Sequence, residues 1–439
     1  MNDVSRAAAR SQRADRLPSD HPERVALANE VHARPYEALQ TPQRAEYLAL
    51  TLDKDERERE ILHLAELCRS FGIVPPVAEA SHFSVSLGAV RVKWERHTEF
   101  SGYTFFAPGE SGEGFGEPVS SALPEGWLPA IPGKTIVAAR AKLAKFAFQT
   151  ADSEYVDAHF GGNVIVGAEI GGTGAGVAFT DFQIDSDGYT RFLVLDRHLV
   201  PRQAGRMLQR LFEIESYRVM ALLALPVARS YVPRIMAIER SLGSLAGQIA
   251  RDDGGDEALL GKLTGLAADV ESAIVASQYR FGASRAYYEL VRARIAELKE
   301  RSLPGIQTIG EFMERRLAPA MATCFSVSER LRELSERVAQ ASGLLSTRVE
   351  IAREKQNQSL LASMDRRAKM QLRLQQTVEG LSVAAITYYV VGLIGYAAKG
   401  LKASGISVDP EIAMAAAIPV VIIILGFVLR RVRRRLGAH

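Results

Sequence analysis

The chain has 439 residues and a net charge of +3 at pH 7, from 54 Lys and Arg against 51 Asp and Glu. This balance gives no support for nucleic-acid binding, and two cysteines are too few for a disulfide framework or a multi-cysteine metal site. Hydrophobic residues make up 47%, so a disordered chain is excluded and two or three folded domains of roughly 100–200 residues are expected.

The first 200 residues divide into a tail and a mixed α/β domain. Residues 1–17 hold four arginines and no apolar run long enough for a signal peptide, so a flexible basic tail is expected. In the domain, residues 18–200, we expect helices at Glu23–Val31 and Pro42–Phe71. A sheet should follow, because later segments alternate apolar and polar residues. The expected strands are Phe83–Leu87, Ala89–Trp94, Tyr103–Phe106, Asn163–Ile170, Gly176–Phe182 and Phe192–Leu195.

Two patterns in this domain superficially suggest ligand sites. The run Gly171–Gly176 lacks the Lys and Ser/Thr of a phosphate-binding loop, and a strand-like segment follows it, so we predict a hairpin turn. The pairs Glu30/His32 and Glu95/His97 would each share a face of a strand. Without a third ligand, ordinary hydrogen bonding is favoured over a metal site. No catalytic constellation is found, and no enzymatic activity is expected.

Residues 201–304 are expected to form a helix followed by a long helical hairpin. The apolar spacing from Gln203 to Leu225 predicts a helix that ends at Pro226, and chain breaks are expected at Arg251–Asp256 and Leu303–Gly305.

A stalk helix is expected over residues 305–379. Its apolar residues recur in alternating steps of three and four, the pattern of a heptad seam, at Cys324, Val327, Leu331, Leu334, Val338, Ala341 and Leu345. The seam can pack on the chain's own helical hairpin or associate with other copies as a coiled coil. Continuity with the following apolar segment favours self-association.

Two uncharged segments, 380–398 and 412–429, have the length of membrane spans. Nine basic residues flank the pair on its outer sides, against two in the loop between, so the positive-inside rule places both outer flanks in the cytoplasm. We therefore expect a multi-pass protein of the bacterial inner membrane. Its main part and both termini, including the basic tail 430–439, would be cytoplasmic.

The two expected spans differ in polarity. Ser382, Tyr389 and Tyr396 recur every seven residues on one face of the first span, whereas the second is apolar on every side. This difference predicts an inner first span and an outer second span in an assembly. The polar face either lines a pore or combines interfacial tyrosines with small-residue helix packing.

Two segments resemble a bacterial family known only as predicted membrane-anchored proteins of unknown function. The first is His21–Arg24 with the run Asn29–Pro35, and the second is Arg210–Arg218 with Ala224–Pro226. The resemblance implies no activity. Its motif residues are Asn29, Glu30, His32, Arg34, Glu213, Glu215, Tyr217 and Arg218.

The order of domain, hairpin, stalk and two carboxy-terminal spans is similar to that of CorA-type divalent cation transporters, which are pentamers with the stalk and first span lining the pore. The overall class implied is an α+β domain with long helices and a CorA-like membrane part. Where that family closes its first span with Y-G-M-N, this chain has Tyr396–Lys399, so only the tyrosine matches. A ring of Lys399 ammonium groups would repel divalent cations, whereas Asp409 and Glu411 in the external loop would attract them.

Two functions follow from these observations. The first is an oligomeric inner-membrane protein on a CorA-like scaffold, either an ion channel or transporter with pore-facing Ser382, Tyr389, Tyr396 and Lys399, or a relative that has lost transport. The alternative is a membrane-anchored scaffold or sensor whose cytoplasmic domain binds a protein partner. The expected partners are the lipid bilayer and further copies of the chain. No cofactor is expected, other than a divalent cation if the chain is a transporter.

Overall fold

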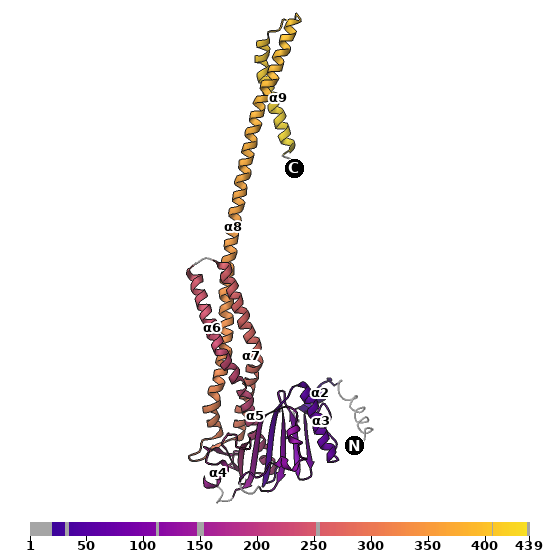
Figure 1. Cartoon of the computed structure of the whole chain (residues 1–439), viewed down its shortest axis with the longest axis vertical. Coiled ribbons are helices and arrows are strands. Elements are labelled where there is room, and N and C mark those ends of the chain that lie inside the picture. The colour runs from indigo at the N-terminus through magenta and orange to yellow at the C-terminus, as the bar shows by residue number, and fades with distance from the viewer. Residues whose placement is uncertain are drawn as a thin grey trace. The chain divides into compact units, whose positions relative to one another are not determined.

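The computed structural model describes residues 20–30, 35–110, 114–146, 153–251, 255–405 and 407–436. The chain forms two compact units (Figure 1). The first consists of Met1–Arg251 with Lys262–Gln340, and the second of Asp252–Gly261 with Ala341–His439.

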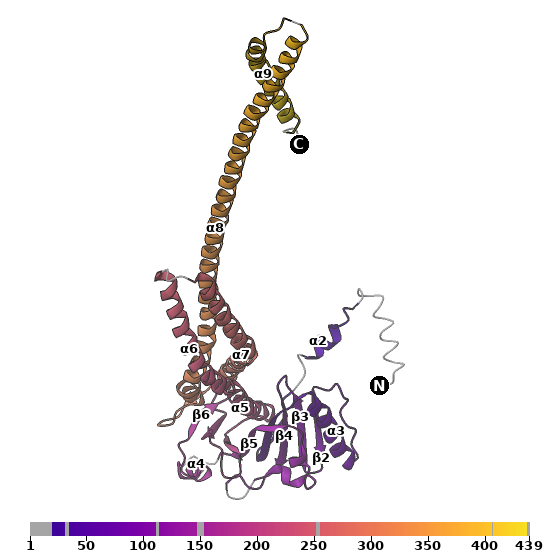
Figure 2. The ribbon, with the colours of Figure 1, turned by 45° about the horizontal axis from the view of Figure 1, so that its top comes forward.

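A mixed sheet forms the centre of the first unit (Figure 2). In the described residues it has nine strands in the order β2-β3-β4-β1-β5-β8-β7-β6-β9, and only β5 and β8 pair in parallel. The strands are β1 Gln43–Thr51, β2 His82–Leu87, β3 Val90–Arg96, β4 Phe100–Pro108, β5 Lys134–Lys145, β6 Val166–Ile170, β7 Gly176–Thr180, β8 Thr190–Asp196 and β9 Arg301–Ser302.

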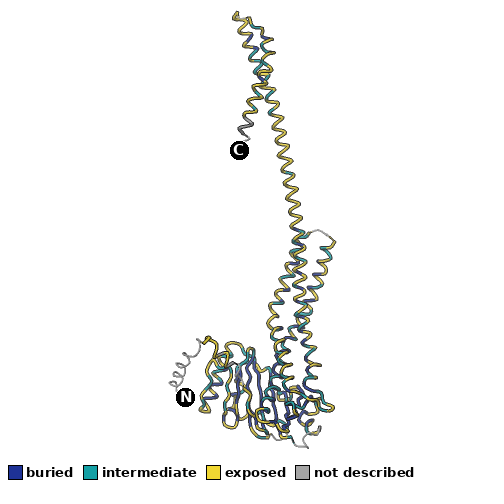
Figure 3. The backbone as a smooth tube through the Cα atoms, turned by 180° about the vertical axis from the view of Figure 1, so that it is seen from behind, coloured by how far each residue is buried: buried dark blue, intermediate teal, exposed yellow. Residues whose placement is uncertain are grey.

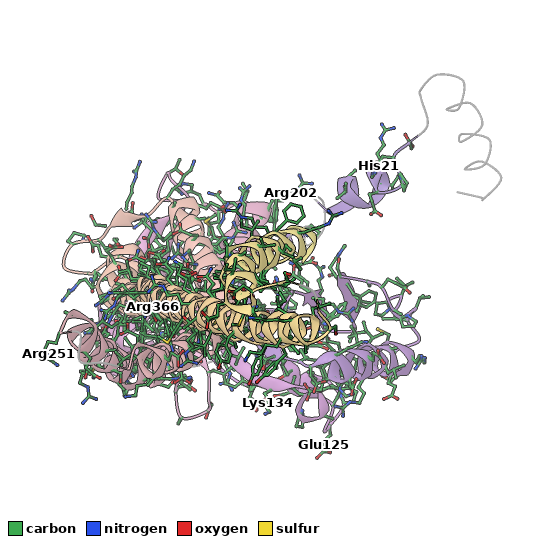
Figure 4. All side chains as sticks on the ribbon, turned by 90° about the horizontal axis from the view of Figure 1, so that it is seen from above. His21, Glu125, Lys134, Arg202, Arg251 and Arg366 are labelled. Atoms are coloured by element: carbon green, nitrogen blue, oxygen red, sulfur yellow. The ribbon has the colours of Figure 1, made fainter. Side chains whose placement is uncertain are left out.

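Helices cover both faces of this sheet. One face carries α3 (Lys54–Ser70), α4 (Ser153–Phe160) and the 3₁₀ helices η1 (Val119–Ala122) and η2 (Leu128–Ala130). The other face carries α5 (Pro201–Leu222), where Phe212 stacks on Tyr47 of β1 at a centroid distance of 5.0 Å. The short α2 (Arg24–Glu30) precedes the sheet. Buried residues concentrate in the sheet and in α5 (Figure 3), whereas charges such as Glu125 and Lys134 lie at its rim (Figure 4).

The expected helix Pro42–Phe71 is wrong in its first part, because Gln43–Thr51 is the central strand β1 between β4 and β5. Its Ala, Leu, Gln and Glu residues favour a helix locally, but pairing on both edges and burial on both faces decide the structure. The second part is confirmed as α3, which begins with a capping box between Asp53 and Glu56. The sequence analysis also missed β5.

The hairpin turn expected at Gly171–Gly176 is confirmed. It joins the antiparallel strands β6 and β7, and Gly171, Gly172 and Gly174 have positive φ angles that glycine adopts without strain. The glycines of this run are therefore explained by the turn that they form.

Long helices follow the sheet strands. They are α6 (Ala224–Arg251), α7 (Asp256–Leu298), α8 (Ile309–Ala403) and α9 (Pro410–Leu436). The predicted hairpin of α6 and α7 is confirmed, although Pro226 lies in the first turn of α6 and not at the end of α5. The start of α8 is fixed by a capping box between Thr308 and Glu311 and by Glu300, whose carboxylate accepts the N–H groups of Ile309 and Gly310.

In the first unit, the heptad seam of α8 packs on the chain's own helical hairpin. Leu331, Leu334 and Val338 are at most 1% exposed within the single chain. Polar contacts on both sides hold the packing, since Arg330 of α8 pairs with Glu239 of α6 and Ser335 of α8 bonds to Glu271 of α7. This corrects the expectation that the seam associates with other copies. In this part of α8, the chain's own helical hairpin already excludes water from the seam.

Within the part of the chain that the structure describes, three helical stretches are long and apolar enough to cross a membrane: Pro201–Arg251, Ile309–Ala403 and Pro410–Arg431. They differ in burial, because 28% of the most apolar window in Pro201–Arg251 is buried, against 11% and 6% in the other two. The part of Pro201–Arg251 that forms α5 thus packs on the sheet.

We predict that Leu334→Asp lowers the free energy of unfolding by roughly 3 kcal/mol or more, because it places an unpaired charge in the dry seam. The thermal midpoint of the full chain in detergent measures the effect. Leu344→Asp on the same helix is the control, since Leu344 is 71% exposed and should tolerate the charge. Equal midpoints for both variants would contradict burial of the seam.

Candidate functional site

The carboxy-terminal part of α8 packs on α9 within the second unit. Gly395 is buried there because α9 passes so close that an added Cβ would lie 2.5 Å from Sδ of Met414. Val391 is half-buried and Ala398 is 4% exposed, so these residues lie on the covered side of α8. A small residue at 395 is thus required for the hairpin of α8 and α9.

Three polar residues of the segment 380–398 lie on the side of α8 that α9 leaves uncovered. Tyr389 and Tyr396 are 71% and 75% exposed, and Ser382 is also exposed. Each tyrosine stands two positions from a covered residue, Val391 or Ala398, which is about 160° around a helix. We call Ser382, Tyr389 and Tyr396 the polar stripe. The spacing of seven thus places these three side chains on one face of α8, and α9 leaves this face uncovered.

The polar stripe ends in a positive charge. Lys399 is exposed, and its Nζ lies 5.9 Å from the ring centroid of Tyr396, within cation–π range. The acidic residues of the loop have a local explanation that the sequence analysis missed, since the Asp409 carboxylate accepts the N–H of Glu411 at 3.0 Å and caps the start of α9. The exposed Glu411 lies in the first turn of α9, where the helix dipole favours an acid.

The second family segment lies on α5 and forms its buried polar contacts. Glu215 is 2% exposed and accepts hydrogen bonds from Thr190 at 3.1 Å and from Nε of Arg218 at 3.0 Å. Arg218 in turn lies 5.2 Å from the ring of Phe182. Tyr217 packs between aromatic rings of β4 and α7. These side chains attach α5 to the sheet and to α7.

A small polar cavity of about 30 Å³ lies between α5 and strands β1, β3 and β4. Lys93 pairs with Glu95 at 3.0 Å and donates to Gln209, and Gln209 donates to Glu213. The volume suits one or two water molecules. Burial raises the pKa of Tyr47, another lining residue, well above its usual range, so its phenol stays protonated.

The pair Glu95/His97 lines this cavity, but its members have separate contacts. Glu95 is held by Lys93, and His97 stacks on Phe100 at a centroid distance of 4.3 Å. Among the described residues, no three His, Cys, Asp or Glu side chains are grouped closely enough to hold a metal ion.

The amino-terminal family segment is only partly described. His21 Nδ1 accepts the N–H of Glu23 at 3.2 Å, and Arg24 pairs with Asp20. Asn29 and Glu30 lie at the end of α2, whereas His32 and Arg34 lie outside the described residues, and with them the Glu30/His32 pair.

Sequence reasoning missed the partners of the motif residues on α5. Arg294 of α7 pairs with both Glu213 and Glu297, and Arg210 donates to Glu297 at 2.8 Å. The sequence signal was limited to the spacing of Arg210 and Glu213, which places both on one helix face. Their partners lie more than 80 residues further along the chain, so local spacing could not identify them.

The chain was compared with known proteins. A family model described as "Protein of unknown function (DUF3422)" matches residues 19–436. No curated protein and no solved structure matches the chain.

We predict that Glu215→Ala lowers the free energy of unfolding by roughly 3–5 kcal/mol, because it leaves Arg218 without its buried carboxylate. Glu289→Ala is the matched control, since Glu289 and Arg292 form a Glu–Arg pair at the same spacing but are about 60% exposed. The control should change stability by less than about 1 kcal/mol. A denaturant titration of both variants measures the difference, and similar losses would contradict a buried role for Glu215.

Proposed function

The chain belongs to the DUF3422 family, a family of unknown function, and we propose that it is an oligomeric protein of the bacterial inner membrane. The α8–α9 hairpin spans the membrane twice, and the first unit and both termini are cytoplasmic. The length and apolar character of these two helices support the spans, and nine flanking basic residues against two in the loop support the orientation. The third apolar stretch, Pro201–Arg251, is assigned to the cytoplasmic unit because α5 packs on the sheet.

The observation that carries the proposal further is the position of the polar stripe. In a membrane, hydroxyl-bearing side chains gain from facing protein or water, not lipid. Ser382, Tyr389 and Tyr396 point away from the residues that α9 covers, and the segment 412–429 of α9 is apolar all round. When several copies assemble with α8 inside and α9 outside, the polar stripes face protein or water and the apolar helices face lipid. The stripes then surround a central polar path.

We propose that this path conducts ions on a CorA-like scaffold. The order of sheet domain, helical hairpin, long α8 and short loop to α9 supports this likeness. The chain departs from divalent cation transporters at Lys399, where a ring of ammonium groups raises the potential at the external mouth. The path is therefore unsuited to Mg²⁺, and the acidic Asp409 is occupied in capping α9.

The second candidate is a membrane-anchored scaffold or sensor. The contact of Lys399 with the ring of Tyr396 favours it, since a lysine and tyrosines at the end of a span also serve as anchors in the headgroup region. In this case the cytoplasmic unit binds a protein partner and nothing passes through the membrane.

We predict opposite locations for reporters fused after His439 and inserted after Ser404 in the loop. The expected result is activity of a cytoplasmic reporter at the first position and of an external reporter at the second, as the positive-inside rule requires. A fusion after Leu303, between β9 and α8 of the first unit, should match the carboxy-terminal one. Both reporters on one side of the membrane would contradict two spans.

The identity of residue 399 separates the two candidates. If the stripes surround a path, Lys399→Asn should increase divalent cation flux in reconstituted vesicles and Lys399→Glu should increase it more, because each step removes positive potential. Lys402→Glu is the control, since Lys402 lies about one turn beyond Lys399, at the loop-proximal end of α8. If neither Lys399 variant changes flux, the anchor is favoured, and robust Mg²⁺ uptake by the natural chain would contradict the electrostatic argument.

A further inference from the structure

A cavity lies between α7 and the amino-terminal part of α8, within the first unit. It measures about 290 Å³, just below the roughly 300–1,000 Å³ that is usual for small-molecule pockets. Its apolar wall consists of Phe281 and Leu331, which are 5% and 1% exposed, and the half-buried Phe325. The cavity therefore has room for a small organic molecule and an apolar surface for part of it.

The charged groups that line this cavity are positive. They are Arg285 of α7 and Arg332 of α8, and no Asp or Glu of the described residues lines it. Within the same part of the chain, Arg285 forms no ion pair, and its guanidinium lies over Phe325 at 4.8 Å from the ring centroid. Arg332 lies 3.8 Å from Glu329, but these side chains are 61% and 62% exposed, so the pair contributes little. An anion is thus the ligand that balances the charge of the cavity.

The two arginines approach the cavity from opposite ends. The helices α7 and α8 run antiparallel here, since Ser284 contacts Met321 whereas the earlier Glu271 bonds to the later Ser335. The arginine of α7 lies at the level of Phe325, and that of α8 follows about two turns later. The Cα–Cβ bonds of a helix lean toward its amino terminus, and the two amino termini point in opposite directions. The two side chains therefore lean toward each other over the cavity.

Neutral polar groups complete the lining. Ser277 is 1% exposed, and its hydroxyl donates to the carbonyl oxygen of Ala273 at 2.7 Å, so that its lone pairs remain for a donor on a ligand. Gln278 and Ser328 line the cavity as well and can both donate and accept. These groups suit a ring that carries N–H or amino groups, in addition to the anionic part that the arginines favour.

We propose that this cavity binds a small organic phosphate with a flat ring, of the size of a nucleoside monophosphate. The phosphate lies between the guanidinium groups of Arg285 and Arg332, and the ring packs on Phe281 and Leu331. A phosphate monoester carries nearly two negative charges at pH 7, which matches two arginines better than a single carboxylate does. A guanidinium that lies over an aromatic ring still presents the N–H groups at its edge to phosphate oxygens.

The proposed site does not depend on how the α8–α9 hairpin functions, because all of its residues lie in the first unit. A ligand held there contacts α7 and α8 at once. It therefore stabilises the packing of α8 on the helical hairpin, since a molecule that binds only the folded state raises its stability. The site thus gives the first unit an input from a soluble phosphate compound, with or without ion conduction.

Equilibrium dialysis of the full chain in mild detergent tests the site, with radiolabelled AMP as the probe. The chain should retain one AMP per copy. Phenyl phosphate should displace it at concentrations at which inorganic phosphate and adenosine do not, because it combines the charge with a ring. No retention of AMP would overturn the proposal. Displacement by inorganic phosphate as efficient as that by phenyl phosphate would overturn the place of the ring on the apolar wall.

Substitution of the arginines locates the bound phosphate. Arg285→Gln should weaken AMP binding roughly 10- to 100-fold, because a hydrogen bond between charged groups is lost, and Arg332→Gln should weaken it as well. Arg292→Gln on α7 is the matched control, since Arg292 is 62% exposed, pairs with Glu289 and does not line the cavity.

The thermal midpoint without AMP should be the same for the natural chain and for these three variants, because the arginines lie at the surface of the helices. Unchanged AMP binding by Arg285→Gln would remove the phosphate from this cavity. An equal loss in Arg292→Gln would show attraction to the general surface charge and would likewise overturn the site.

Filling the cavity gives an independent check. Gly282 lines it, and an added Cβ would meet nothing within 4 Å, so Gly282→Leu should occupy the cavity without disturbing the fold and should abolish AMP retention. Gly265→Leu is the matched control, because Gly265 lies on the same helix, is exposed and open in the same way, and does not line the cavity. AMP retention by Gly282→Leu at the level of the control would contradict binding between α7 and α8.

Discussion

The buried attachment of α5 to the sheet is the constraint on which the first unit depends. The segment before β1 also passes very close to α5, since a Cβ added to Gly205 would lie 1.6 Å from the carbonyl oxygen of Glu37. Further along α5, Glu215 bonds to β8 and Glu213 to Arg294 of α7. Because α5 joins the sheet on one side to α7 on the other, it fixes the base of the helical hairpin. The seam of α8 then has a surface on which to pack.

Two buried carboxylates of this unit, Glu46 and Glu60, are held by hydrogen bonds from several groups. Glu46 is fully buried and accepts hydrogen bonds from the backbone and hydroxyl of Ser120 and from Tyr189. Glu60 accepts from Trp94 and Ser101, yet its pKa is raised because burial disfavours the charged form more than these bonds favour it. Contacts of this kind fix α3, η1 and α5 in specific places on the sheet, which apolar packing alone does less well.

Periodic features were accessible from the sequence, and contacts between distant segments were not. The steps of α8 predicted that Leu331, Leu334 and Val338 share a buried face, because helix geometry alone determines that result. The same spacing left the partner of that face open, and the structure assigns it to α6 and α7. Strand β1 was mistaken for a helix because its residues favour a helix and its two neighbouring strands follow more than 45 residues later.

The candidate site shows the same difference between features that residue spacing predicts and contacts that only the structure reveals. The spacing of seven places Ser382, Tyr389 and Tyr396 on one helix face, but the side covered by α9 could not be deduced from composition, since the segment 412–429 of α9 is apolar all round. The capping role of Asp409 was missed because an acidic loop residue attracts cations and caps helices equally well in a sequence. Only the bond to the N–H of Glu411 distinguishes the two roles.

The chemistry of the polar stripe limits what a path along it can pass. Dehydration of Mg²⁺ needs several well-placed oxygen ligands, usually including carboxylates, and the stripe offers hydroxyl groups without a charge. The hydroxyl of Ser382 also donates to the carbonyl of Val378 at 2.8 Å, which ties its proton to the helix. In the proposed assembly, the aromatic hydroxyls of Tyr389 and Tyr396 would thus be the main polar groups facing the axis. A hydrated monovalent ion or an anion drawn by Lys399 fits such a lining better than a dehydrated divalent cation does. A conducting assembly of this chain would therefore differ in selectivity from divalent cation transporters.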